Sequence, residues 1–143
     1  MRVVNHPSPA PHADHLIVVS RFRVPADERA NFLDRADDAL VALTDQPGCL
    51  AASLGQATDD PELLLLRTEW PGVGAYRRAM SAFDVKVRAV PLLSTAIDEP
   101  SAYEVVRNWD GNAIVRSRTG LAADAGDVSL GSASGPDIDP VRS

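Results

Sequence analysis

A tryptophan at the end of an apolar run is the residue that most clearly suggests a binding site. Residues 62–70 contain four consecutive leucines and end in Trp70, and turn residues and a predicted helix follow at once. A short apolar run of this length is typical of a strand buried on both faces. The indole of Trp70 should lie next to the protein interior, where its N–H needs a hydrogen-bond partner. The sequence therefore predicts that Trp70 forms a wall of a pocket.

Side chains that could bind a metal or act as a nucleophile are few and isolated. His6, His12 and His15 lie near the N-terminus, and their spacing matches no recognised zinc pattern. We interpret them as part of a solvated segment and predict no metal site. Cys49 is the single cysteine, so no intrachain disulfide can form, as is usual in a reducing cytosol. A nucleophilic thiol needs a neighbouring base, and the sequence suggests none for Cys49.

Composition narrows the classes of partner. The chain has 143 residues, which suits one domain. Its net charge of −6 lacks the basic excess that phosphate backbones attract. The longest apolar runs have strand length, and the N-terminus carries no apolar segment of signal-peptide length. We therefore expect a cytoplasmic protein that binds neither nucleic acid nor a membrane.

The first predicted elements are a strand and a helix. Alternating polarity predicts a strand over residues 15–24, with Ser20 and Phe22 on one of its faces. An apolar stripe that includes Phe32 predicts a helix over residues 26–44. The stripe and the Ser20 face should pack against each other.

Two further strands, a second helical region and a last strand follow. They are predicted over 49–58 with a bulge at Gly55, over 62–70, over about 73–82, over 84–96 with a break at Pro91, and over 101–106. The order strand, helix, strand, strand, helix, strand is that of the ferredoxin-like fold. The predicted fold class is therefore α+β, with one antiparallel sheet and helices on one of its faces.

The two ends of the chain have a different composition. Residues 1–14 are rich in proline, and Gly, Ala, Ser and Asp dominate from residue 109 onward. Such segments lack the apolar residues that offset the entropy of ordering. We expect a disordered leader over 1–14, a folded domain over 15–108, and a disordered tail over 109–143 to which a partner could bind.

Several short segments together carry a family resemblance. They are the first strand HLIVVSRFRV, the turn Gln46-Pro47-Gly48-Cys49, the leucine-rich strand ending in Glu69-Trp70, and Ala75 and Val85-Lys86 beyond it. In their order and spacing the chain resembles the antibiotic biosynthesis monooxygenase family over about residues 15–106. The resemblance implies a dimeric α+β barrel, a homodimer in which two ferredoxin-like sheets meet face to face.

The resemblance also implies a pocket between the sheet and the helices. Predicted side-chain directions place there Ser20, Phe22, Phe32, Trp70, Tyr76, Met80 and Phe83, our candidate substrate-binding residues. Ordinary core packing is the alternative for each of them. The opposite face should carry Arg21, Arg23, Arg67 and Glu69, either at the seam between subunits or in solvent.

The chain departs from the family pattern at two histidines. Many members carry one nine residues after the tryptophan and another about five later, where this chain has Ala79 and Asp84. Asp84 could replace the second histidine or cap a helix. Haem-degrading relatives use a helix histidine as iron ligand and an asparagine near the position of Ser20. Because axial ligation needs such a side chain, haem degradation is not expected.

The antibiotic-tailoring branch is the better match in function. Its members oxidise polycyclic phenols with molecular oxygen, and the resemblance implies a monooxygenase for an aromatic or polyketide-like molecule that needs no cofactor. Trp70, Tyr76, Ser20 and Arg77 are candidates to bind a phenol, and the catalytic residues are unknown. Two alternatives stay open: a dimeric binding protein for a small apolar ligand, and a structural or regulatory partner acting through the tail.

Overall fold

The structure, a computed structural model, describes residues 15–116 of the chain. Residues 15–103 form one unit, and residues 104–116 belong to a second unit. The predicted leader over 1–14 and the greater part of the predicted tail, residues 117–143, lie outside the described residues.

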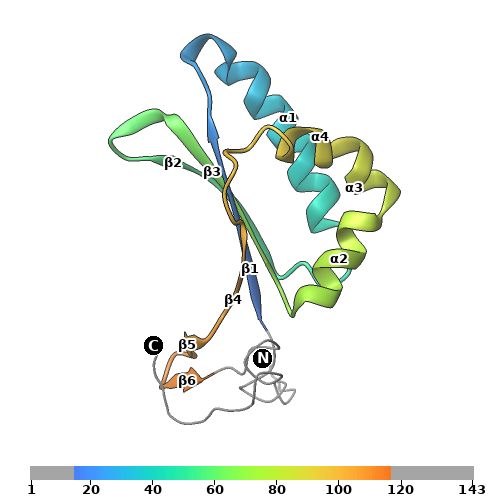
Figure 1. Cartoon of the computed structure of the whole chain (residues 1–143), viewed down its shortest axis with the longest axis vertical. Helices are drawn as coiled ribbons and strands as arrows, with labels where there is room; N and C mark the ends of the chain where they lie inside the picture. The colour runs from blue at the N-terminus through green and yellow to red at the C-terminus, as the bar shows by residue number, and fades with distance from the viewer. Residues whose placement is uncertain (1–14, 117–143) are drawn as a thin grey trace. The chain divides into compact units, whose positions relative to one another are not determined.

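A four-stranded sheet forms one layer of the larger unit (Figure 1). Its strands lie in the order β2–β3–β1–β4, and they are β1 (Leu16–Arg23), β2 (Ala51–Ala57), β3 (Asp60–Trp70) and β4 (Ala102–Glu104). The central strand β3 is antiparallel to both β1 and β2. The order of elements and the sheet confirm the predicted ferredoxin-like α+β fold.

Helices cover one face of this sheet and leave the other face open (Figure 1). They are η1 (Ala26–Glu28), a single 3₁₀ turn that leads into α1 (Arg29–Thr44), then α2 (Val73–Ser81), α3 (Phe83–Arg88) and α4 (Val90–Leu93). The predicted break near Pro91 is present, because this proline lies in the first turn of α4, where its missing N–H costs nothing. Arg88 of α3 forms an ion pair of 3.5 Å with Asp38 of α1 and so ties the helices together.

Alternate residues of β1 and β3 decide which face of the sheet is buried. Ser20 pairs with Leu66 and Phe22 pairs with Leu64, and all four side chains are buried under the helices. Residues between them point to the opposite face, which we call the outer face of the sheet.

The leucine-rich strand is buried on one face only, which corrects the prediction for it. Leu64 and Leu66 are 2% and 3% exposed, whereas Leu63 and Leu65 on the outer face are half-buried. The prediction of burial on both faces is wrong for the single chain, because helices cover only one side of β3.

A glycine turn connects α1 to β2 directly beside α2. Gly48 has a φ of +93°, which other residues rarely adopt, and a Cβ there would lie 3.0 Å from the Cβ of Ala75. The glycine therefore allows α2 to approach this turn closely. In β2 itself the register shifts between Gln56 and Ala57, so the bulge predicted at Gly55 lies slightly further along the strand.

A short hairpin, β5 (Arg107–Trp109) and β6 (Ile114–Arg116), forms the described strands of the second unit. Asp110 Oδ1 accepts hydrogen bonds from the backbone N–H groups of Asn112 and Ala113, both at 2.9 Å, and so closes its turn. The sequence predicted no structure from residue 109, and residues 109–116 differ from that prediction because a few local hydrogen bonds define a tight turn.

We expect Leu64→Ala to lower the free energy of unfolding by about 2–5 kcal/mol, because it opens a cavity in a fully packed core. Leu50→Ala is the matched control, since Leu50 is 58% exposed and its change should cost well below about 1 kcal/mol. Urea denaturation followed by circular dichroism measures both. Equal losses for the two variants would contradict the one-sided burial of β3.

Candidate functional site

A cavity of about 340 Å³ lies between β1, α2, α4 and the segment that precedes β4. Ser20 of β1 and Tyr76 and Met80 of α2 line it, so the structure brings three of the predicted site residues together. Leu93 and Ile97 add an apolar side. The volume falls at the lower end of the range for small-molecule sites, and the lining mixes apolar side chains with a few polar groups, as such sites do.

Ser20 has a hydroxyl that is buried without a protein partner. The described part of the chain buries two polar side chains, Ser20 at 8% exposure and Thr68 at 2%. Thr68 accepts a hydrogen bond from Trp70, but within residues 15–116 no hydrogen bond joins the Ser20 hydroxyl to a protein atom. A buried hydroxyl left in this state costs about 1–3 kcal/mol. A polar group of a ligand in the cavity would remove that cost.

Tyr76 supplies a second hydroxyl to the same cavity. Its ring packs against Trp70, with centroids 5.8 Å apart and planes tilted by 57°. Burial raises the pKa of Tyr76, so the phenol stays protonated at neutral pH and can donate a hydrogen bond. In the described part of the chain this hydroxyl also has no protein partner.

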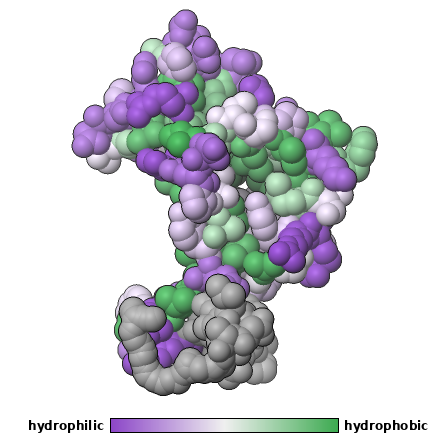
Figure 2. Space-filling model, in the orientation of Figure 1, coloured by the Kyte–Doolittle hydropathy of each residue, from purple (hydrophilic) through white to green (hydrophobic). Residues whose placement is uncertain are grey.

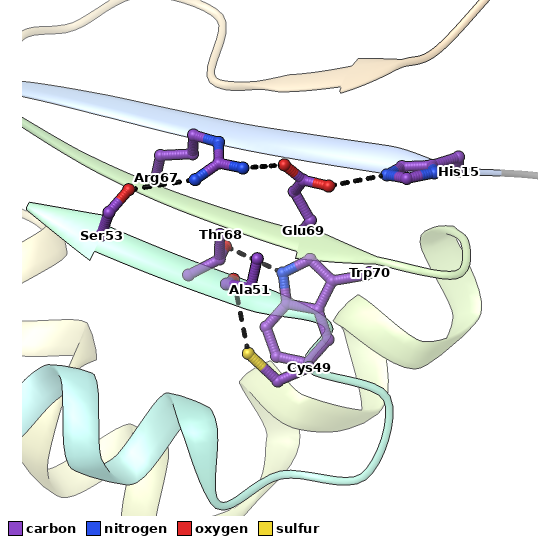
Figure 3. Close-up of polar contacts among 8 residues, drawn as sticks. All are labelled: His15, Cys49, Ala51, Ser53, Arg67, Thr68, Glu69 and Trp70. Carbon is purple, nitrogen blue, oxygen red and sulfur yellow. Dashed lines mark hydrogen bonds and ion pairs between the residues drawn. The ribbon is translucent and has the colours of Figure 1, made fainter. Parts of the chain in front are cut away.

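Trp70 does not line the cavity but packs against Tyr76, which does. The side chain is fully buried, at 0% exposure, and its Nε1–H donates to Thr68 Oγ1 at 2.8 Å (Figure 3). The indole N–H is therefore already satisfied within its own strand and is not free to bind the ligand. Its structural role is to hold the ring of Tyr76.

The remaining predicted residues lie elsewhere. Phe22 and Phe32 pack together with ring centroids 5.1 Å apart and border a separate cavity of about 140 Å³. Phe83 is 80% exposed. Ala82 is extended, with a ψ of 140°, so the helical phase of α2 ends there and Phe83 begins α3 on a different side. Apolar surface is visible over the helix layer in Figure 2.

Two acidic residues that the sequence did not indicate line the larger cavity, Asp98 and Glu99. Arg21 donates to Glu99 from Nε at 2.7 Å and from a terminal nitrogen at 2.8 Å. This hydrogen-bonded guanidinium lowers the pKa of Glu99. Backbone bonds from Ile97 to Arg21 and from Val19 to Ser101, at 2.8 and 2.7 Å, fix the same segment to β1. Only the fold joins these positions, so no local pattern could have revealed them.

The outer face of the sheet carries a chain of polar contacts that joins β2, β3 and the residue before β1 (Figure 3). His15 Nε2 lies 3.0 Å from Glu69 Oε1, Arg67 donates to the other oxygen of Glu69, and Arg67 also donates to Ser53 at 3.0 Å. Burial opposes ionisation of Glu69, but hydrogen bonds from His15 and Arg67 together lower its pKa. This face lies opposite Trp70, as predicted, and its carboxylate is fully engaged.

Other candidate groups are engaged or inactive. Burial raises the pKa of Cys49, so the reactive thiolate is disfavoured. Asp84 pairs with Arg88 at 3.1 Å, and Ala82 is the N-cap of α3, so the predicted cap is wrong. Among residues 15–116 no group of His, Cys, Asp and Glu could hold a metal ion. No helix of the described chain has the length and apolar character to cross a membrane.

The sequence profile named antibiotic biosynthesis monooxygenase matches residues 15–82. This stretch, just under half of the chain, is similar to that family. It comprises β1, α1, β2, β3 and α2, and so contains Ser20, Tyr76 and Met80 of the cavity. The acidic residues Asp98 and Glu99 lie beyond the matched region.

Solved structures share the fold of this domain. SnoaB, a cofactor-independent oxygenase from Streptomyces nogalater, is 22% identical with a TM-score of 0.59, over 70% of this chain and 100% of its own. A candidate antibiotic biosynthesis monooxygenase from Caulobacter crescentus is 16% identical with a TM-score of 0.54, over 66% and 90%. A conserved protein from Methanosarcina mazei is 20% identical with a TM-score of 0.55, over 66% and 94%. No curated protein matches the chain.

We expect Thr68→Val to lower the free energy of unfolding by about 1–3 kcal/mol, because the buried indole N–H of Trp70 then has no acceptor. Thr44→Val removes a hydroxyl that lies on the exposed surface of α1 and should cost less. Denaturation curves give both values. In a Trp109→Phe background Trp70 is the single tryptophan, and an unchanged emission spectrum and stability in Thr68→Val would contradict the assigned contact.

Proposed function

We propose that the protein is a cofactor-independent monooxygenase that oxidises an aromatic or polyketide-like small molecule in the 340 Å³ cavity. The observation that carries the proposal is the buried, unpartnered hydroxyl of Ser20 beside Tyr76. Two such hydroxyls, in a lining that mixes apolar side chains with polar ones, suit a phenol or keto group at the edge of a ring system. The match of residues 15–82 to the monooxygenase family supports the reaction class.

In the proposed reaction the substrate itself reduces O₂. Deprotonation of an activated CH₂ beside a phenol gives an anion that can pass an electron to O₂, and the two radicals combine to a peroxide. Loss of water then leaves a ketone, so that R₂CH₂ and O₂ give R₂C=O and H₂O. The substrate supplies all four electrons, and the protein contributes orientation, hydrogen bonds and shielding from bulk water.

Of the two carboxylates that line the cavity, Asp98 is the candidate proton acceptor. Glu99 is held by the guanidinium of Arg21, and its lowered pKa makes it a weak base. Within the described residues Asp98 forms no ion pair, and it lies at the exposed end of the cavity. A carboxylate there can receive the phenol or CH₂ proton and release it to solvent.

The proposal includes a homodimer that forms through the outer face of the sheet. That face combines half-buried apolar side chains, among them Leu63 and Leu65, with the paired charges of Arg67 and Glu69. Helices leave it uncovered in the single chain, and such a mixture of apolar and paired polar groups suits an interface. A cytoplasmic location belongs to the same proposal, supported by the single cysteine Cys49.

A dimeric binding protein without turnover is the second candidate. It is favoured by the absence of any histidine from the lining of the cavity and by the engagement of the Trp70 N–H. A third hypothesis, a partner acting through its tail, concerns residues that lie largely outside the described chain. Ligand binding without oxygen consumption would select the second candidate.

We expect the wild-type protein to consume O₂ with at least one anthrone-like phenol, and Ser20→Ala to weaken binding of that phenol by about three- to tenfold through loss of one hydrogen bond. The stability of this variant should change little, because the hydroxyl has no protein partner to lose. Ser53→Ala makes the same change on the outer face and should leave binding unchanged. Oxygen-electrode assays and calorimetry measure these effects. No uptake with a broad phenol panel would argue against the oxygenase.

We expect Leu65→Asp to convert the proposed dimer to a monomer, because it places an unpaired charge in the centre of the buried outer face. Val87→Asp is the matched control on the exposed side of α3 and should leave the dimer intact. Sedimentation velocity across a concentration series reports both. A wild-type protein that sediments as a monomer at every concentration would refute this part of the proposal.

A further inference from the structure

The charged groups around the cavity are all acidic. Among its lining residues the ionisable side chains that carry charge at neutral pH are Asp98 and Glu99, and no Arg, Lys or His lines it. Glu99 contacts a cation, Arg21, whose side chain comes from the outer face of the sheet. Arg77 and Arg78 of α2 are exposed and do not line the cavity.

The two acids do not contribute equally. Arg21 binds both oxygens of Glu99, so this pair is close to neutral from the viewpoint of a ligand. Asp98 has no ion-pair partner among residues 15–116 and lies exposed at the edge of the cavity. The cavity thus presents one uncompensated carboxylate to anything that enters.

The hydroxyls specify the other property of a ligand. The Ser20 hydroxyl is more than nine-tenths buried and has no partner within the described chain. Ser20 lies on the face of β1 that the helices cover, and it lines the cavity. It therefore requires a hydrogen-bonding group from the ligand. Tyr76, which stays protonated, offers a second neutral donor.

We propose that the cavity selects neutral hydroxylated or keto-bearing ring compounds and rejects their carboxylated analogues, with Asp98 as the residue that excludes anions. The inference rests on the proposed function for the choice of site, but it concerns binding and not turnover. A carboxylate entering the cavity would lose hydration and approach the charge of Asp98 without meeting a free cation. A neutral phenol of the same shape has no charge for Asp98 to repel and can form hydrogen bonds with the two hydroxyls.

Binding of two probes of the same shape tests this selection. 2-Naphthol is neutral at pH 7 and 2-naphthoate is an anion, and calorimetry gives the Kd of each for the full-length wild-type protein. We expect the Kd of 2-naphthoate to exceed that of 2-naphthol by about tenfold or more at low salt. This ratio, Kd of 2-naphthoate over Kd of 2-naphthol, should decline as salt screens the charge. Equal or tighter binding of 2-naphthoate overturns the inference, and so does the absence of binding by either probe.

Three variants locate the effect. Asp98→Asn should reduce the ratio of the two Kd values by about threefold or more, mainly by tighter binding of 2-naphthoate. Asp59→Asn makes the same charge change at an exposed turn away from the cavity and should leave the ratio unchanged. Arg21→Gln removes the cation that neutralises Glu99 and should raise the ratio. An unchanged ratio in Asp98→Asn, or an equal change in Asp59→Asn, overturns the role of Asp98.

Oxygen consumption separates this inference from the proposed function. Selective binding of 2-naphthol without O₂ uptake by any phenol supports the charge selection and removes the oxygenase. O₂ uptake with carboxylated and neutral phenols at equal apparent affinity supports the oxygenase and removes the charge selection. The charge selection and the oxygenase activity are therefore tested by different measurements.

Discussion

The alternation of side chains along β3 is the constraint on which the rest of the structure depends. Leu64, Leu66, Thr68 and Trp70 face the helices, and the residues between them carry the charges of the outer face. Because a strand has a period of two, a shift of one position would bury those charges and expose the tryptophan. The pairing with β1 transmits the same division to Ser20 and Arg21. One strand therefore decides which groups can reach the cavity and which can reach a second subunit.

The same alternation assigns different roles to neighbouring polar groups. Thr68 accepts the hydrogen bond of the Trp70 N–H within β3, so this indole is a closed part of the core. Ser20 lies on the same face but meets the cavity, and its hydroxyl stays available. Proximity to the tryptophan is thus not what makes a residue available to a ligand. The absence of an internal partner is the better guide to the site.

Much of the architecture could be predicted from the sequence, and less of the site. The period-two pattern of β1 and the order of elements gave the fold and correctly divided Ser20 from Arg21. The apolar positions of α2 indicated Tyr76 and Met80. Phe83 was misplaced because the sequence does not reveal that Ala82 is extended and resets the helical phase. Asp98 could not have been found, because its position in the cavity depends on a turn that only tertiary packing brings to β1.

The ion pair between Arg21 and Glu99 connects two parts of the protein that would otherwise vary independently. Arg21 belongs to the outer face of the sheet, whereas Glu99 belongs to the loop that forms one wall of the cavity. Any change in the position of the guanidinium therefore changes the position or the net charge of that wall. A laboratory selection for new ligands would accordingly recover substitutions on the far side of the sheet as well as inside the cavity, and a redesign of one region would have to treat both as a single unit.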